Sequence, residues 1–357
     1  MEHRNNFDLI RLFAAAQVMV SHAIAHLKLP VHPTIQAAID AFPGVPIFFV
    51  VSGFLISGSW ARKRDIRSFS RNRALRIYPA LWANLVGITL LLAIFGGLAF
   101  WPWDFRFWLW HLIAFVFASD HIASNLLGGL FNGQGIFSFY PSGVLWTLPV
   151  ELSFYLLVPV ILAAPLLRRG LAGLSIGIWV AISLLSYFMI ARVGDWVLFI
   201  GLYLWMFLIG AATQVYWPRV RRIFEGKAVY WLAVHGALTA GLIAATGAQP
   251  VYVVPAWTNI LHTMTLGALA ISIAFTATAA ASGALHGRDI SYGLYLWHMP
   301  VICVLAGCGL TGSWLVFLFA AAVSVIFADL SRRVVEEPAL ALRKRPLTIN
   351  APIVSRP

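Results

Sequence analysis

The residues whose types could support chemistry begin with a histidine and an arginine on one apolar stretch. Asp8, Arg11 and His22 all fall within or beside the apolar run that starts at about residue 7. A charged side chain near the middle of a bilayer-spanning helix costs about 2.5 to 3.5 kcal/mol on insertion scales, so such residues normally face the protein interior. Eleven residues at about 100° each bring His22 back to nearly the same face as Arg11, roughly 16 Å further along the axis. We therefore expect one inward-facing stripe that joins the two halves of a membrane.

Glu151 is the expected partner of His22. It lies about seven residues inside the outer end of the fourth apolar run, so the two side chains are predicted at nearly the same depth. A carboxylate beside an imidazole fixes the tautomer of the ring and favours its use as a general base. Pro149 is expected to kink this helix just before Glu151. The alternative for both residues is a purely structural hydrogen bond or ion pair with a neighbouring helix.

A basic cluster precedes the third apolar run. Seven Lys and Arg residues occur between positions 62 and 76. Such clusters most often set membrane topology, and lipid headgroups are the next most common partner. Arg73 and Arg76, however, stand at i and i+3 on one helical face, where their forked guanidinium groups would suit the phosphates of a nucleotide-bearing cofactor.

Further polar positions lie in or beside later apolar runs. His298 shares a predicted helical face with Ser291 and Tyr295 and would either line the same cavity as His22 or hydrogen-bond between helices. The Glu336-Glu337-Pro338 segment is interpreted as a salt-bridged end to the last apolar run. Two cysteines five residues apart, Cys303 and Cys308, indicate neither a disulfide framework nor a metal site.

The composition determines the class of protein. Hydrophobic residues make up 61% of the 357, charged residues only 11%, and the mean hydropathy is +0.84. Soluble globular domains do not reach these values, so an all-α, polytopic integral membrane protein is predicted. The net charge of +12 comes from short basic loops that set topology, and no nucleic-acid partner is expected.

About ten apolar runs are long enough to span a bilayer. They begin at about residues 7, 43, 78, 144, 171, 196, 228, 256, 289 and 311. The shorter apolar segment 108–119 is predicted to be re-entrant or interfacial. This assignment keeps the basic clusters on one side, with both termini cytoplasmic and the 101–143 region outside. One membrane domain, 1–345, and a short cytoplasmic tail, 346–357, are expected in the cytoplasmic (inner) membrane.

An ordered set of motifs resembles the acyltransferase 3 family of membrane proteins, which O-acylate bacterial surface and secreted carbohydrates. The resemblance covers nearly the whole chain. Its residues are Asp8, Arg11 and His22; 48–56 including Ser52; Arg73, Arg76, Tyr78 and Pro79; Trp146 to Glu151; Ser291 to His298, including Tyr292; and Glu336-x-Pro338. Pro149 departs from the small polar residue often found at that position in the family.

The resemblance implies an acyl-CoA co-substrate, with acetyl-CoA expected, on the cytoplasmic side and no metal. It also implies an acceptor hydroxyl on a lipopolysaccharide, exopolysaccharide or other carbohydrate, or on a glycolipid, near the opposite face. We expect His22 to be catalytic with Glu151, and Arg11, Arg73, Arg76 and Tyr78 to bind the donor. Asp8, Ser52, Trp146, Tyr292 and His298 are expected to support the site.

Two alternatives stay open at this stage. Direct attack by the acceptor and an acyl-histidine relay are both compatible with the residues. A proton-coupled transporter would use the same buried charges, although it predicts inverted repeats that the sequence does not show. The sequence leaves open the identity of the acyl group, the acceptor sugar and the oligomeric state.

Overall fold

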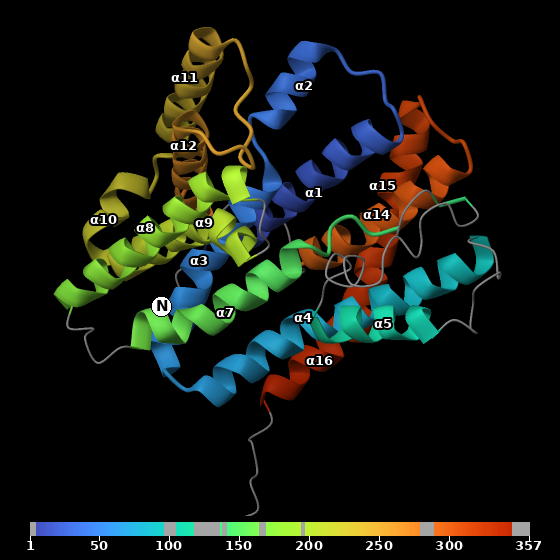
Figure 1. Cartoon of the computed structure of the whole chain (residues 1–357), viewed down its shortest axis with the longest axis horizontal. Coiled ribbons are helices and arrows are strands. Elements are labelled where there is room, and N and C mark those ends of the chain that lie inside the picture. The colour runs from blue at the N-terminus through green and yellow to red at the C-terminus, as the bar shows by residue number, and fades with distance from the viewer. Residues whose placement is uncertain are drawn as a thin grey trace, which may run out of the picture.

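A computed structural model describes residues 5–95, 105–117, 136–137, 141–163, 169–193, 197–278 and 289–344 (Figure 1). Every regular element in these ranges is helical. The elements are α1 (Phe7–His26), α2 (Pro33–Asp40), α3 (Gly44–Lys63), α4 (Ile66–Phe95), α5 (Phe105–Phe117), α7 (Thr147–Ala163), α8 (Arg169–Val193), α9 (Val197–Val215), α10 (Trp217–Phe224), α11 (Ala228–Thr246), α12 (Trp257–Ala274), α14 (Ser291–Gly307), α15 (Trp314–Ser331), η1 (Arg332–Glu336), α16 (Glu337–Ala341) and η2 (Leu342–Lys344).

Each of the ten apolar runs predicted from the sequence contains a helix. Nine of these helices begin within three residues of the predicted start. The exception is α4, which begins at Ile66 instead of about residue 78 and so includes most of the basic cluster. The carboxylate of Asp65 explains the early start, because it accepts hydrogen bonds from the backbone N–H groups of Arg67 at 3.3 Å and Ser68 at 2.9 Å and so caps the helix.

Helix length and apolarity agree with a membrane protein. Within the described residues, five helical stretches are long and apolar enough to cross a bilayer: 7–26, 33–62, 66–95, 228–246 and 314–341. Shorter apolar helices, including α7 and α14, lie between them in sequence. The structure thus agrees with an all-helical membrane protein, whereas ten crossings and the sidedness of the termini stay predictions.

The short helix α5 lies against α4. The Tyr78 hydroxyl donates to the Val116 carbonyl at 3.1 Å, and Thr89 contacts the His111 ring at 2.8 Å, so the two helices run in opposite directions. Further along the chain, the Ile136 N–H donates to the carbonyl of Phe95, the last residue of α4. Ile136 therefore lies at the C-terminal end of α4, where the chain leaves that helix. This position favours a re-entrant α5. Most of the predicted outer region 101–143 lies outside the described residues.

Three parallel helices, α1, α4 and α14, position most of the candidate residues. Arg11 of α1 contacts Asp289, just before α14, and His22 of α1 contacts His298 within α14. The contacts follow the same order along both segments, so α1 and α14 are parallel. Asn84 of α4 donates to the Leu296 carbonyl of α14.

Helix α3 runs antiparallel to α1 and crosses α9 closely. Gly53 of α3 and Gly210 of α9 permit this crossing, because a Cβ at either position would lie 1.9 Å from a carbonyl oxygen of the other helix. Figure 1 shows α11 and α12 as a pair at one end of the molecule, with α4, α5 and α16 at the other.

Candidate functional site

A pair of histidines, the fully buried His298 and the partly buried His22, lies at the centre of the candidate site. His22 Nδ1 is 3.0 Å from His298 Nε2, and His298 Nδ1 is 2.9 Å from the Leu294 carbonyl oxygen. A carbonyl oxygen can only accept, so His298 Nδ1 carries a hydrogen and its Nε2 accepts in the neutral ring. His22 must then donate from Nδ1. This relay leaves His22 Nε2 with a free lone pair in the uncharged pair, the state that a general base requires.

His22 lines a cavity of about 410 Å³ between α1, α3, α14 and the segment before α7. The lining combines aromatic rings with amide, hydroxyl and carboxylate groups: Trp146, Tyr252, Tyr295, Gln17, Ser21, Asp40 and Gln249. We call this the outer cavity. Polar groups that converge among aromatic rings are typical of a small-molecule site.

Glu151 lies elsewhere, with no contact to His22. One oxygen of its carboxylate accepts hydrogen bonds from the Ser52 hydroxyl at 2.9 Å and from the Tyr155 hydroxyl. The expected kink at Pro149 is also wrong, because α7 begins at Thr147 and a proline in the first helical turn breaks no helical hydrogen bond.

Glu151 lines a second, narrow cavity of about 50 Å³. Arg11, Ser52 and Tyr292 line it as well. The narrow and outer cavities share Val45 and Tyr295 as lining residues, so they lie next to each other. Glu151 and His22 therefore belong to adjacent cavities.

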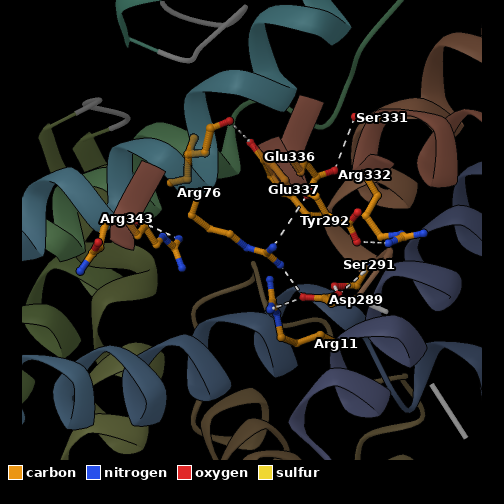
Figure 2. A network of polar contacts seen from close by, with 12 residues as sticks. Arg11, Arg76, Asp289, Ser291, Tyr292, Ser331, Arg332, Glu336, Glu337 and Arg343 are labelled. Carbon is orange, nitrogen blue, oxygen red and sulfur yellow. Dashed lines mark hydrogen bonds and ion pairs between the residues drawn. The ribbon is translucent and has the colours of Figure 1, made fainter. Parts of the chain in front are cut away.

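An ionic network lies at the start of α14. Asp289 accepts from Arg11 Nη1 at 2.7 Å and from Arg76, as Figure 2 shows. Arg76 Nη1 also lies 3.8 Å from a carboxylate oxygen of the buried Glu336. Burial alone would raise the pKa of the Asp289 carboxyl, but the two guanidinium groups hold that pKa below its usual range. We call Arg11, Arg76, Asp289 and Glu336 the arginine network.

The structure separates Tyr78 from Arg73 and Arg76, the other predicted donor-binding residues of α4. Arg73 lies over the Tyr155 ring, with its guanidinium carbon 5.8 Å from the ring centroid, and Arg76 lies 6.0 Å from that of Tyr292. Tyr78 instead faces α5, where its hydroxyl donates to the Val116 carbonyl. Arg11 thus lines the narrow cavity and Arg76 lies over the ring of Tyr292, which also lines it, whereas Tyr78 helps to hold α5.

The supporting residues have different surroundings. The Tyr292 hydroxyl donates to the Ile77 carbonyl at 2.9 Å, and its ring lines the narrow cavity. Trp146 packs on Tyr203 at 5.1 Å between ring centroids and lines the outer cavity. Asp8 is exposed in the first turn of α1.

Reasoning from the sequence missed the roles of two residues. Asp289 was not singled out, although the requirement that an arginine in an apolar helix have an acidic partner would have favoured it. The salt bridge between Arg332 and Glu337 agrees with the predicted salt-bridged end of the last apolar run, but Glu336 is instead buried beside Arg76. In the described part of the chain, no group of His, Cys, Asp and Glu is placed to hold a metal ion.

Comparison with known proteins identifies the family. The family model described as an acyltransferase domain matches residues 4–333 of the sequence. Nodulation protein 10 of Rhizobium leguminosarum bv. viciae is 35% identical over 364 residues, covering 96% of this chain and 94% of that protein. The O-acetyl transferase of Shigella phage Sf6 is 28% identical and covers 99% of both chains.

A third relative has the same kind of match over part of its length. The O-acetyltransferase OatA of Staphylococcus aureus is 26% identical over 93% of this chain and 56% of its own. No solved structure matches the chain. The family assignment favours an acyltransferase over the transporter alternative. The match across nearly the whole chain shows that this protein belongs to the acyltransferase 3 family and is an acyltransferase of groups other than aminoacyl groups.

Proposed function

We propose that this protein is a multi-pass enzyme of the cytoplasmic membrane that moves an acyl group, with acetyl the preferred one, from acyl-CoA to a carbohydrate hydroxyl. The donor would bind from the cytoplasmic side at the arginines, and the acceptor, an extracytoplasmic or lipid-linked sugar, would bind in the outer cavity. The observation that carries this proposal is the relay from the Leu294 carbonyl through His298 to His22, beside a cavity large enough for a sugar.

The reaction follows from the relay. His22 Nε2 takes the proton from the acceptor hydroxyl while its Nδ1–H stays bonded to His298. The acceptor oxygen attacks the thioester carbonyl, the C–S bond breaks, and the thiolate of CoA leaves and takes a proton from the imidazolium. General base catalysis of this kind typically contributes 10²- to 10⁴-fold.

The donor must reach from the arginines to His22. Arg11 and His22 are eleven residues apart on α1, which is roughly 16 Å along the axis. A pantetheine arm that passes through the narrow cavity, between Arg11 and Glu151, would bring the thioester to the wall that the two cavities share. Under this proposal the role of Glu151 changes from orienting His22 to positioning the donor arm, with Ser52 and Tyr155 holding its carboxylate.

The outer cavity suits a carbohydrate. Aromatic rings such as Trp146 and Tyr252 offer flat apolar faces, and Gln17, Ser21 and Gln249 offer hydrogen-bonding groups. A sugar ring presents both kinds of surface.

Transfer of labelled acetyl from acetyl-CoA to endogenous polysaccharide in oriented membrane vesicles tests the proposal. We expect label to appear only when acetyl-CoA is on the cytoplasmic face, and to fall at least 10²-fold in His22→Gln, which keeps a donor toward His298 but lacks the base. His32→Gln, at an exposed histidine, is the matched control. Normal transfer by folded His22→Gln would show that His22 is structural.

A second experiment separates direct attack from an acyl-histidine relay. Wild-type enzyme is incubated with labelled acetyl-CoA in the absence of acceptor and quenched within one turnover. The direct mechanism predicts no label on the protein. Label that depends on His22 would instead support the acyl-histidine relay.

A further inference from the structure

The C-terminal end of the described chain is fastened to the basic start of α4. Arg71 Nη2 donates to the Leu342 carbonyl at 2.6 Å, and Arg343 Nη2 donates to the Asn72 carbonyl at 2.8 Å. These reciprocal hydrogen bonds join residues 271 positions apart. The family match ends at residue 333. Arg343, in η2, therefore reaches the start of α4 from outside the matched region.

Arg343 lies close to the guanidinium groups of Arg73 and Arg76. Figure 2 shows its side chain beside that of Arg76. Burial, together with the nearby charges of Arg73 and Arg76, lowers the pKa of Arg343 from its ordinary value to about 10, so the group stays protonated at neutral pH. Arg73, Arg76 and Arg343 therefore lie near one another although their like charges repel.

Among the described residues, carboxylates pair with only one of these three guanidinium groups. Arg76 pairs with Asp289 and Glu336. Within the described residues, neither Arg73 nor Arg343 forms an ion pair, and the buried Nε atom of each has no hydrogen-bond partner. Buried polar groups are nearly always hydrogen-bonded, and buried charges are nearly always paired. The two guanidinium groups thus lack a counter-ion among the described residues, and an anion would supply it.

We propose that Arg343 binds the phosphate groups of the nucleotide end of the donor, together with Arg73 and Arg76. This inference rests on the proposed use of acyl-CoA. Guanidinium groups bind phosphate through two parallel hydrogen bonds, which a single ammonium group cannot reproduce. A phosphate between Arg73 and Arg343 would also remove the repulsion between them. An anionic lipid headgroup carries the same phosphate chemistry, so the experiment must separate the two sources.

Equilibrium binding of CoA to the purified protein in nanodiscs of phosphatidylcholine is the direct test. We expect Arg343→Gln to weaken CoA binding at least tenfold, because a hydrogen bond to a charged group is lost. Pantetheine, which has the arm but no phosphate, should bind equally to both proteins. Arg343→Lys should recover only part of the affinity. In steady-state assays the KM for acetyl-CoA should rise while kcat changes little.

Two control variants separate binding from structure. Arg333→Gln removes the same charge from an exposed arginine that pairs with Asp329, and it should bind CoA normally. Arg71→Gln breaks the other hydrogen bond between α4 and η2 but leaves Arg343 in place. If Arg71→Gln and Arg343→Gln weaken CoA binding equally, Arg343 only fastens the C-terminal segment and the inference is wrong.

The remaining outcomes are distinguishable. Unchanged CoA affinity in Arg343→Gln, with acyl-CoA-dependent transfer by wild type, overturns the inference and leaves the proposed function in place. An Arg343→Gln defect that appears only as weaker binding of phosphatidylglycerol assigns the site to lipid and also overturns it. Failure of wild type to bind CoA or to use acyl-CoA overturns both proposals.

Discussion

The histidine pair and the arginine network both link α1 to α14 or to the residue just before it, but they are built from different interactions. His22 and His298 are joined by hydrogen bonds between neutral groups, and the His298 side chain is fully buried. Arg11, Arg76 and Asp289 form ion pairs whose side chains keep 14% to 22% of their surface exposed. A neutral relay can function away from water, whereas a buried charge is costly unless it is fully paired.

The difference indicates separate roles for the two sites. The histidine pair can hold a proton acceptor without a permanent charge. Near the arginine network, Arg73 and Arg343 form no ion pair with any described residue, so their guanidinium groups can accept an anion. The following predictions test this contrast in order of decreasing effect.

Replacing His298 should have the largest effect. His298→Leu is expected to lower kcat about 100-fold with little change in the KM for acetyl-CoA, because His22 loses the hydrogen-bond acceptor that fixes its tautomer. His235→Leu is the matched control, since His235 is equally buried but hydrogen-bonds Thr265 and the Ala41 carbonyl. Full activity of a folded His298→Leu variant would remove the hydrogen bond between His22 and His298 from the mechanism.

Asp289→Asn should destabilise the protein by about 3 kcal/mol, because two partly buried guanidinium groups lose their shared carboxylate. Thermal unfolding in one detergent, with and without the substitution, measures this. Asp329→Asn, at a more exposed ion pair of α15, should lower the Tm by less than Asp289→Asn does, because water screens exposed ion pairs. Equal shifts in Tm for the two variants would contradict the assignment of Asp289 as the centre of the network.

The pH dependence of the same comparison follows from the lowered pKa of Asp289. A carboxyl whose pKa is lower in the folded than in the unfolded state stabilises the protein above the unfolded value, and the contribution is lost as the pH falls through the folded value. The difference in Tm between wild type and Asp289→Asn should therefore stay constant from pH 8 down to about 4.5 and narrow only below about pH 4. A difference that disappears near pH 6 would contradict this assignment.

Glu151→Gln should have a smaller effect of a different kind. We expect the KM for acetyl-CoA to rise by up to about tenfold, with the pH profile of kcat unchanged, since Glu151 lines the cavity beside Arg11 and has no contact with His22. A loss of kcat as large as that of His298→Leu, with a shifted pH profile, would instead restore Glu151 as the partner of His22.

The smallest expected effect is on the preference for neutral over anionic acceptors. Asp40 lines the outer cavity, and no Lys or Arg is among the described residues that line it. Asp40→Asn should raise transfer to acceptors that carry a carboxylate by roughly a few-fold and leave neutral acceptors unchanged, because a like charge is removed. Equal changes for neutral and anionic acceptors would show that Asp40 does not set charge preference.

Local sequence patterns predicted the helices well and their partners poorly. Hydropathy located the ten helices, but it missed the early start of α4 because the Asp65 cap and the basic first turns are polar. Counting residues gave comparable depths for His22 and Glu151. Depth along an axis does not fix the direction in which a side chain points around that axis, and the structure places the two residues in adjacent cavities.

The sequence by itself determined an all-helical membrane protein, the inward stripe from Arg11 to His22 and the family, because hydrophobic periodicity, the cost of buried charge and motif order are all properties of the linear chain. Only the tertiary structure decided which groups pair. His22 meets His298 and Arg11 meets Asp289 across 276 and 278 residues, respectively. Such contacts depend on how α1 packs against α14, and helix packing is set by the fit of whole surfaces, which no local spacing specifies.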